Sequence, residues 1–231
     1  MRGLRSMSLC ALIAVSMQAG GASPQGTASE WRALIDDAGA AGWRNVGKAS
    51  LDPRWRIVEG ALVLTPGGGD IITRETWGDF ELEFEWKLPA GGNSGLFYRA
   101  VEAEPIWARA VEYQLLDDEA AEDRFMPTHR AGAVYDLVAP SAQMTRPAGE
   151  FNRSRVVACG SRVEHWLNGA RVAAYDADSK DWHARVSASK FAGQSGFASA
   201  RRGHIGLQDH GDAVHVRAMR IRALARCGGQ P

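Results

Sequence analysis

Apolar and acidic residues alternate without interruption over residues 80–86, which read FELEFEW. Side chains two residues apart lie on the same face of a β-strand, so this pattern separates an aromatic face from an acidic one. The aromatic face would hold Phe80, Leu82, Phe84 and Trp86, and the other face Glu81, Glu83 and Glu85. The segment therefore predicts a strand with its apolar face in a core and its acidic face in solvent.

The same two-residue period recurs along most of the chain, with Gly, Pro, Asn or Asp between the segments. Two strands are expected on either side of Glu59-Gly60 and two more on either side of Asn168-Gly169. The second pair should form a tight hairpin, because a type I′ turn needs two residues that accept positive φ. Further runs typical of strands are LFYRAV (96–101), VEYQLLD (111–117), GAVYDLV (132–138) and RVVACG (155–160).

Two segments depart from the plain strand pattern. Near the C-terminus the apolar positions change phase between Ala218 and Met219, which predicts a β-bulge. Helical periodicity is confined to TASEWRALIDDA, residues 27–38. Strands that recur at short spacing with turn residues between them favour a β-sandwich or jelly roll, in a single domain over residues 31–224.

The first 22 residues have the pattern of a secretory signal peptide. Arg2 and Arg5 precede an apolar run over residues 7–17, which is followed by small residues up to Ala22. This run is shorter than the roughly 20 residues that a membrane-spanning helix needs. We expect cleavage near Ala22, a flexible start over residues 23–30, and a periplasmic or secreted protein without membrane insertion.

Charge and cysteine content narrow the classes of function. The 231 residues include 27 Lys plus Arg and 27 Asp plus Glu, and this balance supplies no basic field for nucleic acid. After processing, two cysteines remain, Cys159 and Cys227, at a spacing that fits no metal motif. An exported protein permits a disulfide between them. The alternative is a buried small residue and a free thiol in a C-terminal tail, residues 225–231.

Familiar catalytic motifs are absent from the sequence: it has no phosphate-binding glycine loop, no HExxH zinc motif and no GxSxG nucleophile elbow. The polar segments that remain are NSGLFYR (93–99), EYQLLD (112–117), EHWLNG (164–169), SKF (189–191) and GLQDHG (206–211). Each of these is a weak signal when taken alone.

Taken in order, these segments resemble the 3-keto-disaccharide hydrolase domain family over roughly residues 31–224. Other matching blocks are Leu34 to Trp43, Glu59-Gly60, Gly132 to Tyr135 and Gly149 to Asn152. The resemblance implies a concanavalin-like jelly-roll sandwich of two antiparallel sheets and cleavage of glycosides that carry a ketone at carbon 3. Two positions depart from the family pattern: the closing strand keeps only Arg217, and Asp36 to Ala38 replace an Asn-Gly pair.

The implied reaction explains which residue types a site would need. A ketone at carbon 3 acidifies the hydrogen on carbon 2, so a base can remove it, the enolate can expel the substituent at carbon 1, and water can add. This needs a base near neutral pKa and a cation or donors beside the enolate oxygen. The candidates for base and acid are His210, Glu112 and Asp117, and those for the cation are Arg99 and Lys190. A bound divalent metal is an alternative to these cations, so the metal requirement stays open.

The remaining polar candidates are expected to bind the sugar substrate: Asn93, Gln114, Tyr135, Gln208 and Arg217. A structural interpretation stands beside each role. Asp117 and His210 can serve as turn residues, Tyr135 can fill the core, and the cations can lie on the surface. We interpret Trp166 as a packing residue and His165 as a cross-strand surface residue.

Two other functions stay open at this point. A concanavalin-like sandwich can be a noncatalytic carbohydrate-binding module, since a fold does not determine a function. A conventional glycoside hydrolase, which acts on unoxidised sugars with a pair of carboxylates, is the second alternative. Turnover distinguishes an enzyme from a binding module, and the oxidation state of the substrate distinguishes the two enzymes.

Overall fold

The computed structural model describes residues 29–36, 39–225 and 227. The predicted signal peptide, most of the predicted flexible start and most of the predicted tail lie outside the described residues. Among the residues described, no helix is both long enough and apolar enough to cross a membrane.

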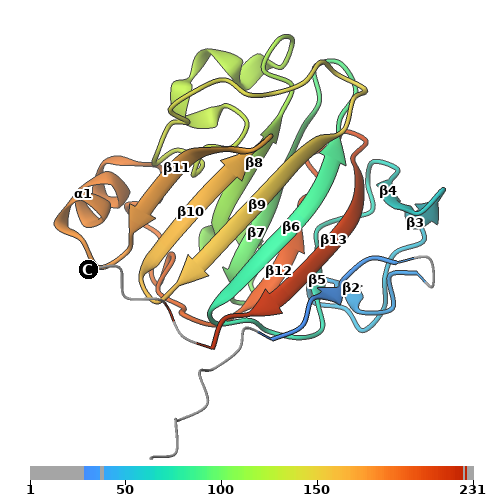
Figure 1. Ribbon diagram of the computed structural model, residues 1–231, viewed down its shortest axis with the longest axis horizontal. Coiled ribbons are helices and arrows are strands. Elements are labelled where there is room, and N and C mark those ends of the chain that lie inside the picture. Colours follow the sequence, from blue (N-terminus) through green and yellow to red (C-terminus); the bar gives the residue numbers. More distant parts are fainter. Residues whose placement is uncertain (1–28, 37–38, 226, 228–231) are drawn as a thin grey trace, which may run out of the picture.

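Two antiparallel sheets lie face to face and enclose the main hydrophobic core (Figure 1). The larger sheet has the order β11 (Ala170–Asp176), β10 (Arg162–Leu167), β9 (Asn152–Cys159), β6 (Phe80–Lys87), β13 (His215–Ala223), β4 (Ala61–Leu64), β3 (Trp55–Val58), with β1 (Arg32–Ala33) also paired to β13. The smaller sheet has the order β2 (Trp43–Asn45), β5 (Ile71–Thr73), β12 (His204–Leu207), β7 (Asn93–Ala100), β8 (Val111–Leu116). The predicted all-β sandwich is confirmed.

Strand β6 lies in the middle of the larger sheet, and its aromatic face is buried as predicted. Its acidic face differs from the prediction, because arginines of the two neighbouring strands neutralise the carboxylates. Glu81 is only 7% exposed and pairs with Arg155 of β9 and Arg222 of β13. Glu83 is paired in the same way, with Arg153 and Arg220. This face therefore carries a network of ion pairs and is not a solvated acidic surface.

The prediction of helices was wrong in two ways: part of the segment expected to be helical is a strand, and a helix lies where none was expected. Residues 32–33 form β1, which pairs with β13, so this part of the segment is a strand and not a helix. The structure has an α-helix elsewhere, α1 (Lys180–Ala188). Ser179 caps it by accepting the N–H of Trp182. Because Trp182 is the only buried residue of α1, the sequence shows no apolar stripe there.

The structure corrects two further interpretations, those of the GAVYDLV segment and of His165, and it locates Trp166. The GAVYDLV segment is a turn and not a strand, since Gly132 and Asp136 both have positive φ, of 83° and 60°. His165 is fully buried, with one ring nitrogen 2.9 Å from the Tyr98 hydroxyl and the other 3.0 Å from the Gly132 carbonyl oxygen. Burial lowers the pKa of His165 to about 4. Trp166 lies on the opposite face of β10, half-buried beneath the Arg155 guanidinium.

The predicted bulge and both predicted hairpins are confirmed. The pairing of β13 with β6 shifts register between Arg217 and Arg220, where Ala218 has a φ of 47°. Asn168 and Gly169, with φ of 48° and 91°, connect β10 to β11 as a type I′ turn requires.

Gly169→Val is expected to lower the free energy of unfolding by about 1–3 kcal/mol, because a β-branched residue is strained at positive φ. An added Cβ at Gly169 would have no atom within 4 Å, so the cost comes from the backbone alone. Gly193 also has open space but no positive φ, which makes Gly193→Val the matched control. Denaturant unfolding of the two variants measures the difference, and equal stabilities would contradict this account of the turn.

A disulfide joins Cys159 to Cys227, with the two Cα atoms 5.3 Å apart. The alternative of a buried residue and a free thiol is therefore excluded. The bond ties the chain beyond β13 to the end of β9, and it closes a loop across a sequence separation of 68 residues. Disulfides persist in oxidising compartments, so this bond is consistent with the predicted export.

Candidate functional site

The outer face of the smaller sheet carries a row of polar side chains that crosses several strands. Gly95 of β7 is the register partner of Gln114 of β8, and its carbonyl oxygen accepts the N–H of Gln208, which follows β12, at 2.9 Å. Asp70, just before β5, extends the row, because its Oδ1 accepts the N–H of Asp209 at 2.8 Å. Adjacent strands are about 4.8 Å apart, so these groups line one path across the sheet.

Glu112 lies on the same face of β8 as Gln114 and is 5% exposed. A Cβ added to Gly95 would lie 2.1 Å from Glu112 Oε1, so the carboxyl group occupies the space that a side chain at position 95 would take. The register partner of Glu112 is Phe97, which belongs to a small apolar cluster with Ile72 and Ile106. The carboxyl group therefore lies between a polar row and an apolar surface.

Burial raises the pKa of the Glu112 carboxyl to about 8. The neighbouring carboxylates of Asp70 and Asp123 act in the same direction, and the Lys190 ammonium group acts against them. At neutral pH this carboxyl group is therefore mostly protonated but close to its titration range. Such a group can act as a general base or a general acid.

Lys190 and Tyr135 form one wall of the site. The Lys190 Nζ lies 4.1 Å from the centroid of the Tyr135 ring and 5.2 Å from that of Trp107. The Tyr135 backbone N–H donates to the Glu112 carbonyl oxygen at 3.1 Å. On the Tyr135 ring also lies His129 of the 3₁₀ helix η3 (Pro127–His129), with the ring centroids 4.3 Å apart.

A chain of hydrogen bonds orients the Gln114 carboxamide. The Gln114 Nε2 donates to Asn93 Oδ1 at 3.0 Å, and Asn93 Nδ2 donates to Asp123 Oδ2 at 3.4 Å. Asp123, in the 3₁₀ helix η2 (Glu122–Phe125), is a carboxylate and accepts only, so it sets the direction of the whole chain. This leaves Gln114 Oε1 buried without a donor, and the same is true of Gln208 Oε1. Each of these two carbonyl oxygens can accept a hydrogen bond from a ligand or from water.

The loop after β12 borders the other side of the site. The Asp209 carboxylate accepts the N–H groups of Gly67 and Gly69, at 2.9 and 2.8 Å, and so fixes the start of this loop. His210 is exposed, and its positive charge acts to lower the pKa of the half-buried Asp70. Burial raises the pKa of Asp70, which adds a second carboxyl group with a raised pKa to the site.

The structure does not bring three of the predicted site residues to this cluster. Both oxygens of Asp117 accept backbone N–H groups, from Gly91 at 2.7 Å and Glu119 at 3.1 Å, as expected of a residue that caps a turn. Arg99 is buried, with its guanidinium bound to Asp79 and to the carbonyl oxygens of Gly78 and Gly160. Arg217 lies on the larger sheet, where it pairs with Glu85.

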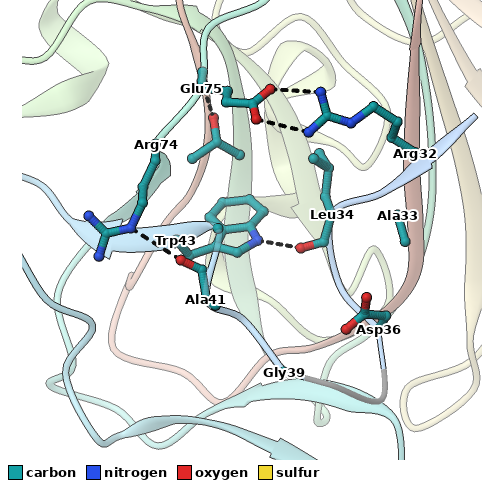
Figure 2. A pocket seen from close by; sticks show the side chains of 11 residues that line it. Arg32, Ala33, Leu34, Asp36, Gly39, Ala41, Trp43, Arg74 and Glu75 are labelled. Atoms are coloured by element: carbon teal, nitrogen blue, oxygen red, sulfur yellow. Dashed lines mark hydrogen bonds and ion pairs between the residues drawn. The ribbon is translucent and has the colours of Figure 1, made fainter.

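Neither a metal cluster nor the pocket of Figure 2 provides an alternative site. Within the described part of the chain, no group of three or more His, Cys, Asp or Glu side chains could hold a metal ion.

The pocket in Figure 2, of about 310 Å³, lies between β1 and the chain after β5. Its polar groups bond to one another: Arg32 with Glu75, Trp43 Nε1 with the Leu34 carbonyl, and Arg74 Nε with the Ala41 carbonyl. It contains none of the predicted site residues.

Sequence reasoning missed four polar residues of the site: Asp70, Asp123, His129 and Asp136. Asp123 and His129 come from short 3₁₀ helices, which show no periodicity. Asp70 was recoverable in principle, because it directly precedes a buried strand, β5. Asp136 belongs to the site because its Oδ2 accepts the Lys190 backbone N–H at 2.9 Å, and its positive φ gives no signal in the sequence beyond the residue type.

Comparison with known proteins gives a match to one family over most of the chain. The profile of a family described as the 3-keto-alpha-glucoside-1,2-lyase-like domain matches residues 30–222. A relative from Bacteroides thetaiotaomicron, named 3-keto-disaccharide hydrolase, is 32% identical over an alignment 217 residues long, and this alignment covers 79% of this chain and 74% of the relative.

Solved structures support the same assignment. A crystal structure of a candidate glycosyl hydrolase from Parabacteroides distasonis is 26% identical, with a TM-score of 0.79 over 84% of this chain and 94% of that chain. A Bacillus subtilis protein with a galectin-like fold shows the likeness in fold alone, at 14% identity and a TM-score of 0.54 over 87% of this chain and 98% of that one. The predicted jelly-roll sandwich and the predicted class of enzyme, a hydrolase of glycosidic bonds, are confirmed.

Proposed function

The chain belongs to the 3-keto-alpha-glucoside-1,2-lyase-like family, and from this premise we propose that it cleaves 3-keto glycosides by elimination followed by hydration. The observation that carries the proposal is the buried Glu112 carboxyl group, whose pKa of about 8 suits removal of a carbon-bound proton made acidic by a neighbouring ketone. A 3-keto glycoside has such a proton on carbon 2.

The surrounding groups have roles that follow from their chemistry. Ionised Glu112 takes the proton from carbon 2, and the electron pair forms an enolate whose oxygen faces the Lys190 ammonium group. The enolate re-forms the ketone and expels the oxygen on carbon 1, which gives a double bond between carbons 1 and 2 in the ring. His210 protonates the leaving oxygen, and water then adds its oxygen to carbon 1 and its hydrogen to carbon 2.

The substrate class is supported by the unpartnered acceptors. The Oε1 atoms of Gln114 and Gln208 are buried and need donors, and sugar hydroxyl groups supply them. They border the Gly95 position over which the Glu112 carboxyl lies. A sugar that bonds both carboxamides would therefore have a ring carbon close to the base.

The test is cleavage of one glycoside in its 3-keto and its unoxidised form, with deuterium on carbon 2. The proposal expects cleavage of the oxidised substrate with loss of the deuterium to solvent, both with and without a chelator. Cleavage that retains all the deuterium would exclude elimination. Equal rates of cleavage of the oxidised and the unoxidised glycoside would favour a conventional glycosidase. Binding without turnover would favour a carbohydrate-binding module.

We expect kcat/KM for the 3-keto substrate to rise with pH, to reach half of its maximum near pH 8 and to level off above that pH. Glu112 must be ionised to act as a base, and its carboxyl loses its proton around pH 8. A pH series of initial rates with the parent enzyme measures this limb. A rate that falls between pH 6 and 8 would instead assign Glu112 as an acid.

Export is part of the proposal. The Arg2 and Arg5 pattern before a short apolar run predicts a signal peptide, and the Cys159–Cys227 disulfide suits an oxidising compartment. N-terminal sequencing of the protein from its native host tests this. A chain that keeps Met1 and fractionates with the cytosol would contradict it.

A further inference from the structure

The position of the Lys190 charge depends on how its backbone is held. Lys190 follows α1 in a loop, and a lysine side chain is flexible over four carbons. The contacts of the ammonium group are with aromatic rings, at 4.1 Å from the Tyr135 centroid and 5.2 Å from those of Trp107 and Phe191. Such contacts constrain direction less strictly than a hydrogen bond does. Placing this charge beside Glu112 therefore needs an anchor at the backbone.

Asp136 supplies that anchor. Its Oδ2 accepts the backbone N–H of Lys190 at 2.9 Å, and its Oδ1 lies 3.2 Å from His129 Nε2. Its own N–H donates to the Thr128 carbonyl oxygen at 3.0 Å. One carboxylate thus joins the loop of Lys190 to η3 and to the turn that carries Tyr135.

The backbone at Asp136 adopts a conformation suited to this task. Its φ of 60° lies in the left-handed region, which Asp tolerates better than most residues with a Cβ. The adjacent Tyr135 is bonded through its N–H to the carbonyl oxygen of Glu112 at 3.1 Å. Asp136, which holds the Lys190 backbone, is therefore the neighbour in sequence of Tyr135, which is hydrogen-bonded to the strand that carries Glu112.

We propose that Asp136 is a positioning residue, which holds the Lys190 backbone so that the ammonium group faces the Glu112 carboxyl. Its role in catalysis rests on the proposed function of that site, but the placement of the charge does not. The charged and titratable groups that face Glu112 are Lys190 from this loop, Asp123 from η2, Asp70 from the chain before β5, and Tyr135 from the turn.

The test is direct titration of Glu112 in the ligand-free protein. The carboxyl signal is followed by infrared difference spectroscopy and assigned by its loss in Glu112→Gln. A nearby cation favours the ionised carboxyl, so Lys190→Met should move the titration to higher pH, by about one pH unit. Asp136→Ala should give a shift of the same sign and similar size, and the double variant should shift no further than Lys190→Met alone.

Two further variants keep the test decisive. Asp136→Asn can still accept the Lys190 N–H and donate to His129, so it should titrate like the parent; Asp181→Ala, which removes an exposed carboxylate of α1, should do the same. Should Asp136→Ala not fold, Asp136→Ser takes its place, since a single hydroxyl cannot hold both partners. An unchanged titration in the Ala or Ser variant, or a shift that adds to that of Lys190→Met, would overturn the proposal.

This outcome is separate from the fate of the proposed function. If the protein cleaves no 3-keto glycoside, the titration still reports whether Asp136 places the charge. If it does cleave them, the acid limb of kcat/KM should move with the titration in each variant.

Discussion

Glu112→Gln is expected to lower kcat/KM for a 3-keto glycoside by about 10²- to 10⁴-fold, the range that a general base contributes. The carboxamide keeps the size of the side chain but cannot take a proton from carbon 2. Because Glu112 lies against Gly95 and the apolar cluster of Phe97, an isosteric replacement should leave the packing unchanged. Initial rates with purified parent and variant measure the effect.

The stability of the same variant provides an independent check. The folded protein holds a proton on Glu112 up to about pH 8, whereas the ordinary pKa is 4.5. As pH rises through this window the unfolded chain releases a proton that the folded chain keeps, so the parent loses stability. Glu112→Gln does not titrate, and at pH 9 it should therefore unfold at a higher temperature than the parent.

Glu119→Gln is the matched control for both measurements. Glu119 is exposed and lies just after the strand that carries Glu112, so its neutralisation should change neither the rate nor the alkaline stability. An active Glu112→Gln enzyme would remove Glu112 from the role of base and direct attention to Asp70 and His210.

The strands and turns were predictable because they depend on local patterns. The alternation in β6 and the Asn168-Gly169 turn each follow from sequence neighbours, and both are observed. The ion pairs that cover Glu81 depend on Arg222, far away in the sequence, so the sequence alone suggested solvent. The same limit explains His165, whose burial follows from which face of β10 meets the smaller sheet.

The candidate site was predictable only in part. Glu112 and Gln114 were chosen by resemblance, and they lie together on one strand face. Arg99 was chosen by the same resemblance but is bound to Asp79, because the positive φ at this residue ends the regular alternation of β7. Asp123 comes from a short 3₁₀ helix and Asp136 from a turn, and tertiary contacts set the positions of both, so no local pattern identified them.

Gly95→Ala is the second prediction with a large expected effect. An alanine Cβ would lie 2.1 Å from Glu112 Oε1, far closer than two such atoms approach, so the carboxyl group must move. The backbone of Gly95 needs no positive φ, and the three atoms nearest to the added Cβ, all within 3.0 Å, are the Oε1, Cδ and Cγ atoms of the Glu112 side chain and not backbone atoms, so the fold should tolerate the change. Since a displacement of about 1 Å can cost about 10²-fold in rate, kcat/KM should fall by about this factor.

A double variant assigns the loss to Glu112. If alanine acts only by displacing the carboxyl group, adding Gly95→Ala to Glu112→Gln should lower the rate little further, because the base is already absent. Gly42→Ala is the control, since its added Cβ meets no atom within 4 Å and its φ is not positive. A Gly95→Ala enzyme with parental kcat/KM would show that the carboxyl group can work from another position. A loss that persists in full on top of Glu112→Gln would place the importance of Gly95 in direct contact with the sugar.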